Sequence, residues 1–203
     1  MRQASQRLLR LFAAVMALSL AAGCAGLNTL TSEVSSFGDW PPARKAGSYA
    51  FERLPSQQAR PKVQDALEAA ARDALAAAGF TPAAPGAEPE FLVQLGARAT
   101  RQEVSPWSDP VWWNGGFAAW RYRPWVGPRW SPYWHEEFSR FDREVAVLVR
   151  ERASGKPLYE ARASNSGSTS LDAAMLRAMF AAALKDFPAT GLNPRSVNVP
   201  LGG

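Results

Sequence analysis

The stretch FDREVAVLVRERASGKPLYEARASNS, residues 141–166, decides the fold. It divides into two strands, 141–153 and 157–166, because every second residue is apolar: Val145, Val147 and Val149 in the first, and Tyr159, Ala161 and Ala163 in the second. Only Ser154-Gly155-Lys156 separates the two runs. So short a connection predicts an antiparallel hairpin with one buried face.

Three further segments before this hairpin are predicted to be strands. Residues 30–37 form a possible strand, and SYAFERL at 48–54 forms a short one that ends at Pro55. Residues 90–104 form a long strand with one apolar face: Phe91, Val93, Leu95, Ala97 and Ala99. Residues 81–89, rich in Pro, Ala and Gly, are expected to connect a helix to this strand.

Two segments have helical periodicity. The first covers residues 63–78, begins after Pro61, ends before Gly79, and has an apolar stripe at Val63, Leu67, Ala70, Ala74, Leu75 and Ala78. Lys62, Asp65, Glu68 and Arg72 are expected on its polar side, and its alanines to pack closely on a sheet. The second begins at Ser170 as N-cap and continues to Phe187, with an apolar face assigned to the core.

This order, β-β-α-β-β-β-α, predicts an α+β fold. We expect a single domain with a mainly antiparallel sheet and two helices packed on one face, since helices follow strands without regular alternation. A long Trp-rich loop lies between the third and fourth expected strands. Val197, Val199 and Leu201 alternate and are consistent with an additional edge strand.

The first 23 residues have the layout of a secretory signal peptide. Three arginines precede an apolar run at 11–20, and small residues then lead to Cys24. The run is shorter than the roughly 20 residues of a membrane-spanning helix. LAAGC at 20–24 resembles the bacterial lipobox, in which the cysteine receives a diacylglyceryl group, although Ala21 stands where that pattern usually has Leu. Ordinary secretory cleavage and an uncleaved anchor are the alternatives.

We therefore expect a cleaved lipoprotein signal peptide at 1–23, a lipidated tether at 24–29, and one domain over 30–203. Cys24 is the chain's only cysteine, so no intramolecular disulfide is expected. Removing residues 1–23 takes away three arginines and no acid, which lowers the net charge from +5 to +2. The basic character of the whole chain is therefore no argument for nucleic-acid binding.

An aromatic insert, residues 105–138, is the second unusual feature. It holds seven of the eight tryptophans, with arginines between them, and connections this long usually have a function or are disordered. Its candidate partner-binding residues are Trp107, Trp112, Trp113, Trp120, Arg121, Tyr122, Arg123, Trp125, Arg129, Trp130, Tyr133 and Trp134. Such rings stack on sugars, contact proteins or lie among lipid headgroups. A covered satellite core and a mobile arm are the alternatives.

No arrangement of residues indicates catalysis. His135, the only histidine, lies near Ser139 and Asp142, but nothing resembles a nucleophile elbow. His135 and the neighbouring acids Glu136 and Glu137 lack metal-ligand spacing, and Asn114-Gly115-Gly116 is typical of a turn rather than a phosphate loop. We expect no enzyme activity, no cofactor and no metal.

Several motifs in order resemble the small bacterial lipoproteins of domain-of-unknown-function family 4136. They are the lipobox cysteine, SYAFERL, Gly79-Phe80, EFLVQL, the Trp/Gly/Tyr/Pro-rich insert, the SGKPLY hairpin and Phe187-Pro188. The resemblance implies an envelope lipoprotein with no assigned reaction. Ala25 is not the aspartate that retains lipoproteins in the inner membrane of enteric bacteria, so we expect the periplasmic face of the outer membrane. A glycan or an envelope protein is the possible further partner.

Overall fold

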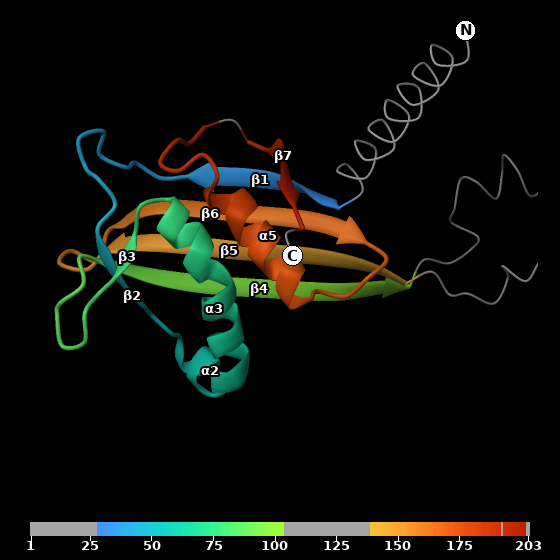
Figure 1. Cartoon of the computed structure of the whole chain (residues 1–203), viewed down its shortest axis with the longest axis horizontal. Helices are drawn as coiled ribbons and strands as arrows, with labels where there is room; N and C mark the ends of the chain where they lie inside the picture. Colours follow the sequence, from blue (N-terminus) through green and yellow to red (C-terminus); the bar gives the residue numbers. More distant parts are fainter. Residues whose placement is uncertain (1–27, 104–138, 192, 202–203) are drawn as a thin grey trace, which may run out of the picture.

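The computed structural model describes residues 28–103, 139–191 and 193–201 (Figure 1). These residues form an α+β fold, as expected, with one seven-stranded sheet and three helices. In chain order the elements are β1 (Thr29–Phe37), β2 (Ser48–Phe51), α2 (Pro55–Gln58), α3 (Pro61–Ala77), β3 (Thr81–Pro82), β4 (Phe91–Glu103), β5 (Ser139–Glu151), β6 (Pro157–Gly167), α5 (Ala173–Leu184) and β7 (Arg195–Pro200).

The sheet is mixed: most of its strand pairs are antiparallel, and the parallel pairs of β2 depart in detail from the prediction of a mainly antiparallel sheet. Its spatial order is β3-β2-β4-β5-β6-β1-β7, and β2 runs parallel to both β3 and β4. The remaining pairs are antiparallel, including the predicted β5–β6 hairpin. The parallel pairs arise because α2 and α3 carry the chain from β2 back to the start of the next strands, and a parallel connection needs such a crossover.

Two elements, α2 and β3, are additions to the predicted order. Pro55 begins the short helix α2 rather than only ending a strand, because proline suits a first helical turn. Gln57 fixes this turn, since its Oε1 accepts the Leu54 N–H at 2.9 Å and its Nε2 donates to the Leu95 carbonyl at 2.6 Å. Within the predicted connector, Thr81 and Pro82 form β3. The optional edge strand is confirmed as β7, which pairs with β1.

Helices α3 and α5 lie on the same face of the sheet (Figure 1). The N-cap of α5 is Asp172 rather than Ser170, because the Asp172 side chain accepts the Met175 N–H at 2.8 Å. The helix also ends at Leu184, before Phe187. Phe187 nevertheless packs in the core, where its ring centroid lies 4.7 Å from that of Trp40 and 5.0 Å from that of Phe80.

The predicted sheet core is confirmed along its central part. The valines of β5 and Tyr159, Ala161 and Ala163 of β6 are buried, as are Phe91, Val93 and Leu95 of β4. Ala97 and Ala99, which continue the same face of β4, are exposed. The apolar face of that strand therefore extends beyond the part that the helices cover.

The buried face of α3 is rotated from the predicted stripe. Val63, expected in the core, is 65% exposed, whereas Glu68, expected on the polar side, is buried. The carboxylate of Glu68 is satisfied by Arg53, whose Nε donates to Glu68 Oε1 at 2.6 Å and whose Nη2 donates to Oε2 at 2.8 Å. The alanines of α3 face α5 as well as the sheet, which the close packing of the two helices requires.

Candidate functional site

One end of the sheet carries both the start of the described chain and the two ends of the aromatic insert. β1 begins there at Thr29, which pairs with Pro200. Glu103, the last residue of β4, pairs there with Ser139, the first residue of β5. Neighbouring strands lie about 4.8 Å apart and only β6 separates β1 from β5, so their axes are about 10 Å apart. The tether and the insert are thus joined to the same end (Figure 1).

The residues predicted to act at this end lie outside the described residues. This holds for Cys24 and for all twelve aromatic and basic candidates of the insert, from Trp107 to Trp134. It also holds for His135. Of the two residues suspected beside it, Asp142 lies in β5 and its Oδ1 accepts a hydrogen bond from Ser166 Oγ at 2.7 Å.

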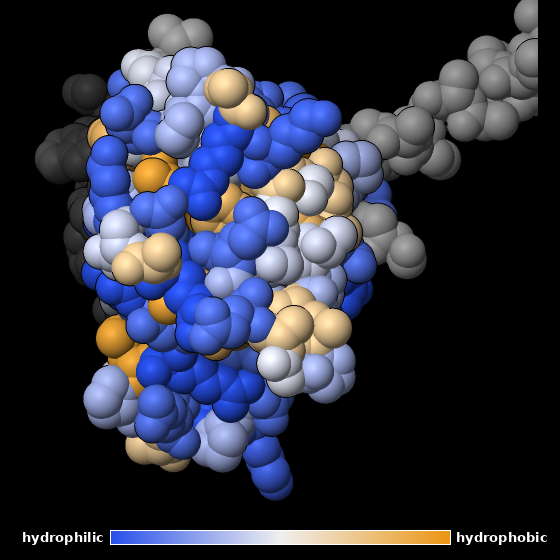
Figure 2. Space-filling model, turned by 90° about the vertical axis from the view of Figure 1, so that its left-hand side faces the viewer, coloured by the Kyte–Doolittle hydropathy of each residue, from blue (hydrophilic) through white to orange (hydrophobic). Residues whose placement is uncertain are grey.

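The opposite end of the sheet is mostly hydrophilic (Figure 2). Its loops hold two ion pairs, Arg44–Glu151 at 2.5 Å and Arg152–Glu88 at 2.8 Å. Hydrogen bonds from Ser154 and Arg44 lower the pKa of Glu151, and the hydrogen bond from Arg152 lowers the pKa of Glu88. The charges of these loops are therefore largely paired with one another.

The sheet face turned away from α3 and α5 is likewise a face of paired charges. Arg98 pairs with Glu144 at 2.8 Å across β4 and β5, and Arg162 pairs with Glu160 at 2.8 Å along β6. Arg150 also contacts Glu52. These pairs are consistent with a solvated surface, since partly exposed ion pairs of this kind contribute little beyond solubility.

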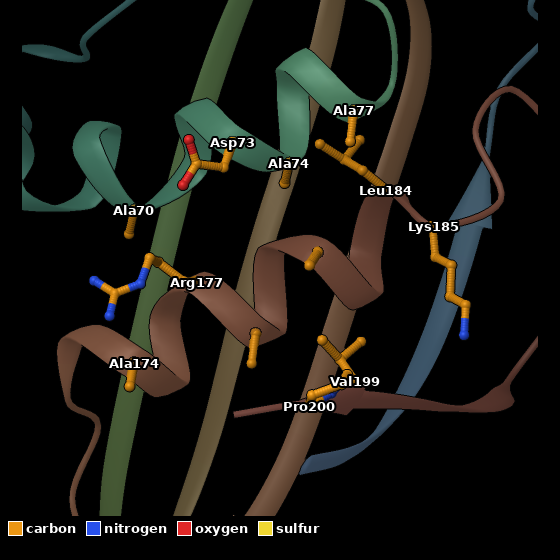
Figure 3. A pocket seen from close by; sticks show the side chains of 12 residues that line it. Ala70, Asp73, Ala74, Ala77, Ala174, Arg177, Leu184, Lys185, Val199 and Pro200 are labelled. Atoms are coloured by element: carbon orange, nitrogen blue, oxygen red, sulfur yellow. The ribbon is translucent and has the colours of Figure 1, made fainter. Parts of the chain in front are cut away.

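A first hollow of about 450 Å³ lies between α3, α5 and β7 (Figure 3). Alanines from both helices line it, including Ala70, Ala74 and Ala174. Asp73 of α3 and Arg177 of α5 lie on its two sides, so the hollow carries one charge of each sign from these residues. Small side chains that let two helices approach are sufficient to explain this hollow.

A second hollow of about 680 Å³ lies where β4 extends beyond its helical cover, and we call it the α2–β4 groove. It is lined by residues of α2, the first half of α3, the second half of β4 and the segment that leads into α5: Leu54, Ser56, Gln57, Arg60, Lys62, Val63, Gln64, Ala66, Leu67, Gly96, Ala97, Ala99, Leu171 and Leu176. It contains no Asp or Glu. Val63, the residue of α3 that was expected in the core and is exposed instead, lines it.

A buried arginine lies in the sheet beside this groove. Arg143 of β5 is only 3% exposed, and it lies between Ala99 of β4 and Asn165 of β6 in the strand registers. Its Nη1 contacts Met175 Sδ and Thr169 Oγ1, but its Nε has no hydrogen-bond partner. Burial lowers the pKa of Arg143. The sequence contained the signal for this position, because Arg143 is in phase with the valines of β5.

Among the described residues, no group of three His, Cys, Asp or Glu side chains is arranged to hold a metal ion. Within the same residues, no helix combines the length and the apolar character that crossing a membrane requires. The described part of the chain therefore offers two hollows and one buried cation as its unusual features.

A family model described as "Domain of unknown function (DUF4136)" matches residues 33–189. No curated protein matches the chain significantly. Among solved structures, a PDZ domain protein from Parabacteroides distasonis is similar at 12% identity with a TM-score of 0.50, over 84% of this chain and 38% of that one. The chain thus spans well under half of that protein, and the likeness shows the fold alone.

Two crystal forms of the PelC dodecamer from Paraburkholderia phytofirmans also show similarity. Their identities to this chain are 9% and 12%, and their TM-scores are 0.36 and 0.37. The alignments cover 74% and 73% of this chain and 92% of each PelC chain.

Proposed function

The chain belongs to the DUF4136 family, and on that premise we propose that it is a lipid-anchored lipoprotein of the bacterial cell envelope with a non-enzymatic structural or interaction role. The observation that carries this proposal is the lipobox-like stretch Leu20–Cys24 after a basic and apolar leader. Acylated Cys24 would be the first residue of the mature chain, on the periplasmic face of the outer membrane. Three acyl chains, such as palmitate, bind far more firmly than one, at about 0.8 kcal/mol per buried CH₂.

The short tether supports a position close to the membrane. Thr29, the start of β1, lies five residues after Cys24 in the sequence. At roughly 3.3–3.6 Å per extended residue, this span reaches no more than about 18 Å. The end of the sheet at which β1 begins would therefore face the bilayer, and the paired charges of the opposite loops would face the periplasm.

The anchor is tested by Cys24→Ser in the full chain, with Ala25→Ser as the matched control. Membranes are washed at high salt, which removes electrostatic surface contacts. We expect the Cys24→Ser protein in the wash and the control in the membrane pellet, together with loss of metabolic palmitate labelling only in Cys24→Ser. A Cys24→Ser protein that stays in the pellet and remains labelled would refute the anchor.

A second candidate function is a binding module that uses the aromatic insert. The observation that favours it is that the insert and the tether are joined to the same end of the sheet. The insert connects the end of β4 to the start of β5, and the tether precedes the start of β1 at that end. A chain anchored at Cys24 would therefore present its Trp, Tyr and Arg side chains to lipid headgroups, glycan or an envelope protein, and such side chains suit all three.

This second function is tested in the Cys24→Ser background. Residues 104–138 are replaced by Asn-Gly, which joins the paired ends Glu103 and Ser139 by a two-residue hairpin turn. We expect the chain with the insert to sediment with anionic vesicles or with peptidoglycan, and the shortened chain to stay in the supernatant. Equal behaviour of the two chains would argue against a binding role for the insert.

A further inference from the structure

We propose that the α2–β4 groove binds the acyl chain of a single-chain anionic lipid, with the headgroup held by Arg60 and Lys62. This inference goes beyond the proposed function, because it rests on a groove built from described residues outside the anchor and the insert. It also involves only residues that the structure describes.

The walls of the groove are apolar and open to solvent. Val63 is 65% exposed and Leu54 is 44% exposed, and both are among the few large apolar side chains with that exposure in the described chain. Leu171 and Leu176, partly buried, form the wall on the side of α5. Large apolar groups gathered around one hollow, rather than scattered singly, are typical of a binding surface.

Small residues create the depth of the groove. Ala97 and Ala99 occupy the face of β4 that Phe91, Val93 and Leu95 fill further back along the strand. Replacement of large side chains by methyl groups leaves space between the sheet and the start of α3. The resulting volume, about 680 Å³, lies within the roughly 300–1,000 Å³ of small-molecule sites.

The engaged side-chain amide of Gln57 favours a hydrocarbon chain over a peptide. Gln57, the amide on the α2 side, already donates its Nε2 to the Leu95 carbonyl and accepts the Leu54 N–H. A peptide would bring its own N–H and C=O groups, which need partners once they leave water. A chain of methylenes has no such requirement.

The charge at the mouth of the groove selects an anionic headgroup. Arg60 and Lys62 flank the start of α3, and neither forms an ion pair within the described residues. The nearby carboxylates of Asp65 and Glu68 are both occupied by Arg53. Two cations that have no ion-pair partner among the described residues, beside an apolar hollow, fit a carboxylate or phosphate attached to one acyl chain.

The test uses the full chain in phosphatidylcholine vesicles with a palmitate that carries a photoactivatable diazirine on its chain. Labelled peptides are mapped by mass spectrometry. We expect the label within residues 54–67, 96–99 and 171–176, and we expect unlabelled palmitate to displace it. A label spread over the chain, or one that palmitate does not displace, would overturn the proposal.

Two variants block the groove. Ala97→Trp fills its floor, and Val63→Glu places a charge on its wall; both positions are exposed, so the fold is expected to tolerate them. Each should remove most of the label from the groove peptides, whereas Ala84→Trp, at an exposed alanine of the β3–β4 connector, should leave it unchanged. Full labelling of both blocked variants, with thermal unfolding like that of the unmodified chain, would refute the assignment.

The headgroup is tested separately. Arg60→Gln with Lys62→Gln should lower labelling by the palmitate probe about tenfold, the ratio expected when a charge-assisted hydrogen bond is lost. Labelling by the corresponding neutral hexadecanol probe should not change, and Lys45→Gln with Lys156→Gln should affect neither probe. Equal loss for both probes would contradict the role of the two cations. Absence of the lipid label from the groove peptides, in a chain that sediments as a dimer, would overturn the proposal and assign the groove to self-association.

Discussion

Replacing Arg143 by methionine should make the protein more stable. The guanidinium is almost completely buried, its Nε lacks a partner, and none of the ion pairs in the described chain involves it. A buried polar group without a partner costs about 1–3 kcal/mol. Methionine retains the unbranched stem and lies beside Met175, a residue that adapts well to irregular space.

We expect Arg143→Met to raise the free energy of unfolding by about 1–3 kcal/mol, since apolar replacement of buried charge is often neutral or stabilising. Thermal unfolding should shift upward by about 2–4 °C for each kcal/mol. Burial holds the pKa of Arg143 below its usual value, so folding disfavours the charged form. The free-energy cost of burying the charged guanidinium is present at every pH at which the arginine is protonated. The stability gained by Arg143→Met should therefore be constant between about pH 5 and pH 8.

Urea denaturation of the full chain and of Arg143→Met measures this difference. Arg98→Met is the matched control, because Arg98 lies at the surface of β4 with Glu144 as its partner. The control should change stability by no more than about 0.5 kcal/mol. A less stable Arg143→Met protein would show that the contacts of the guanidinium outweigh the cost of its burial, and would refute the reasoning.

Three other predictions concern the framework. Hydrogen bonds from Ser154 and Arg44 lower the pKa of Glu151 in the folded protein. The stabilisation from this carboxylate should therefore be complete above pH 4.5, the ordinary pKa, and be lost as the pH falls through the folded pKa. Glu151→Gln should reduce this loss of stability at acid pH, as measured by urea titrations at a series of pH values. Phe80→Ala should cost about 3–5 kcal/mol in the same assay, because the ring is 1% exposed. Asp172→Ala should cost about 1 kcal/mol and Ser170→Ala much less, which calorimetry can compare.

The parts of the fold that follow from local alternation were predictable. The β5–β6 hairpin has one covered face, so the valines of β5 and Tyr159 of β6 show directly which side is buried. The position of β2 was not predictable in this way. Its parallel pairing depends on the path of the chain through α2 and α3, and four residues with one buried side chain do not specify a partner.

The environment of α3 depended on contacts distant in sequence. Glu68 has the character of a surface residue, but Arg53 from the preceding segment satisfies it in the interior. Val63 has the character of a core residue, but among the described residues its side chain is exposed. The α2–β4 groove therefore could not be identified from periodicity, because it depends on where the helices end relative to β4.

The arrangement of β1 has a mechanical consequence. Its first part, Thr29–Val34, is paired with β7 on one side, and its second part, Glu33–Phe37, is paired with β6 on the other. The hydrogen bonds of an antiparallel ladder are perpendicular to the strands. Tension applied at Thr29 along the strand axis would therefore load both ladders in shear, so that many bonds resist together instead of opening one after another. A protein pulled through its first strand would withstand far more force than one unzipped from an edge.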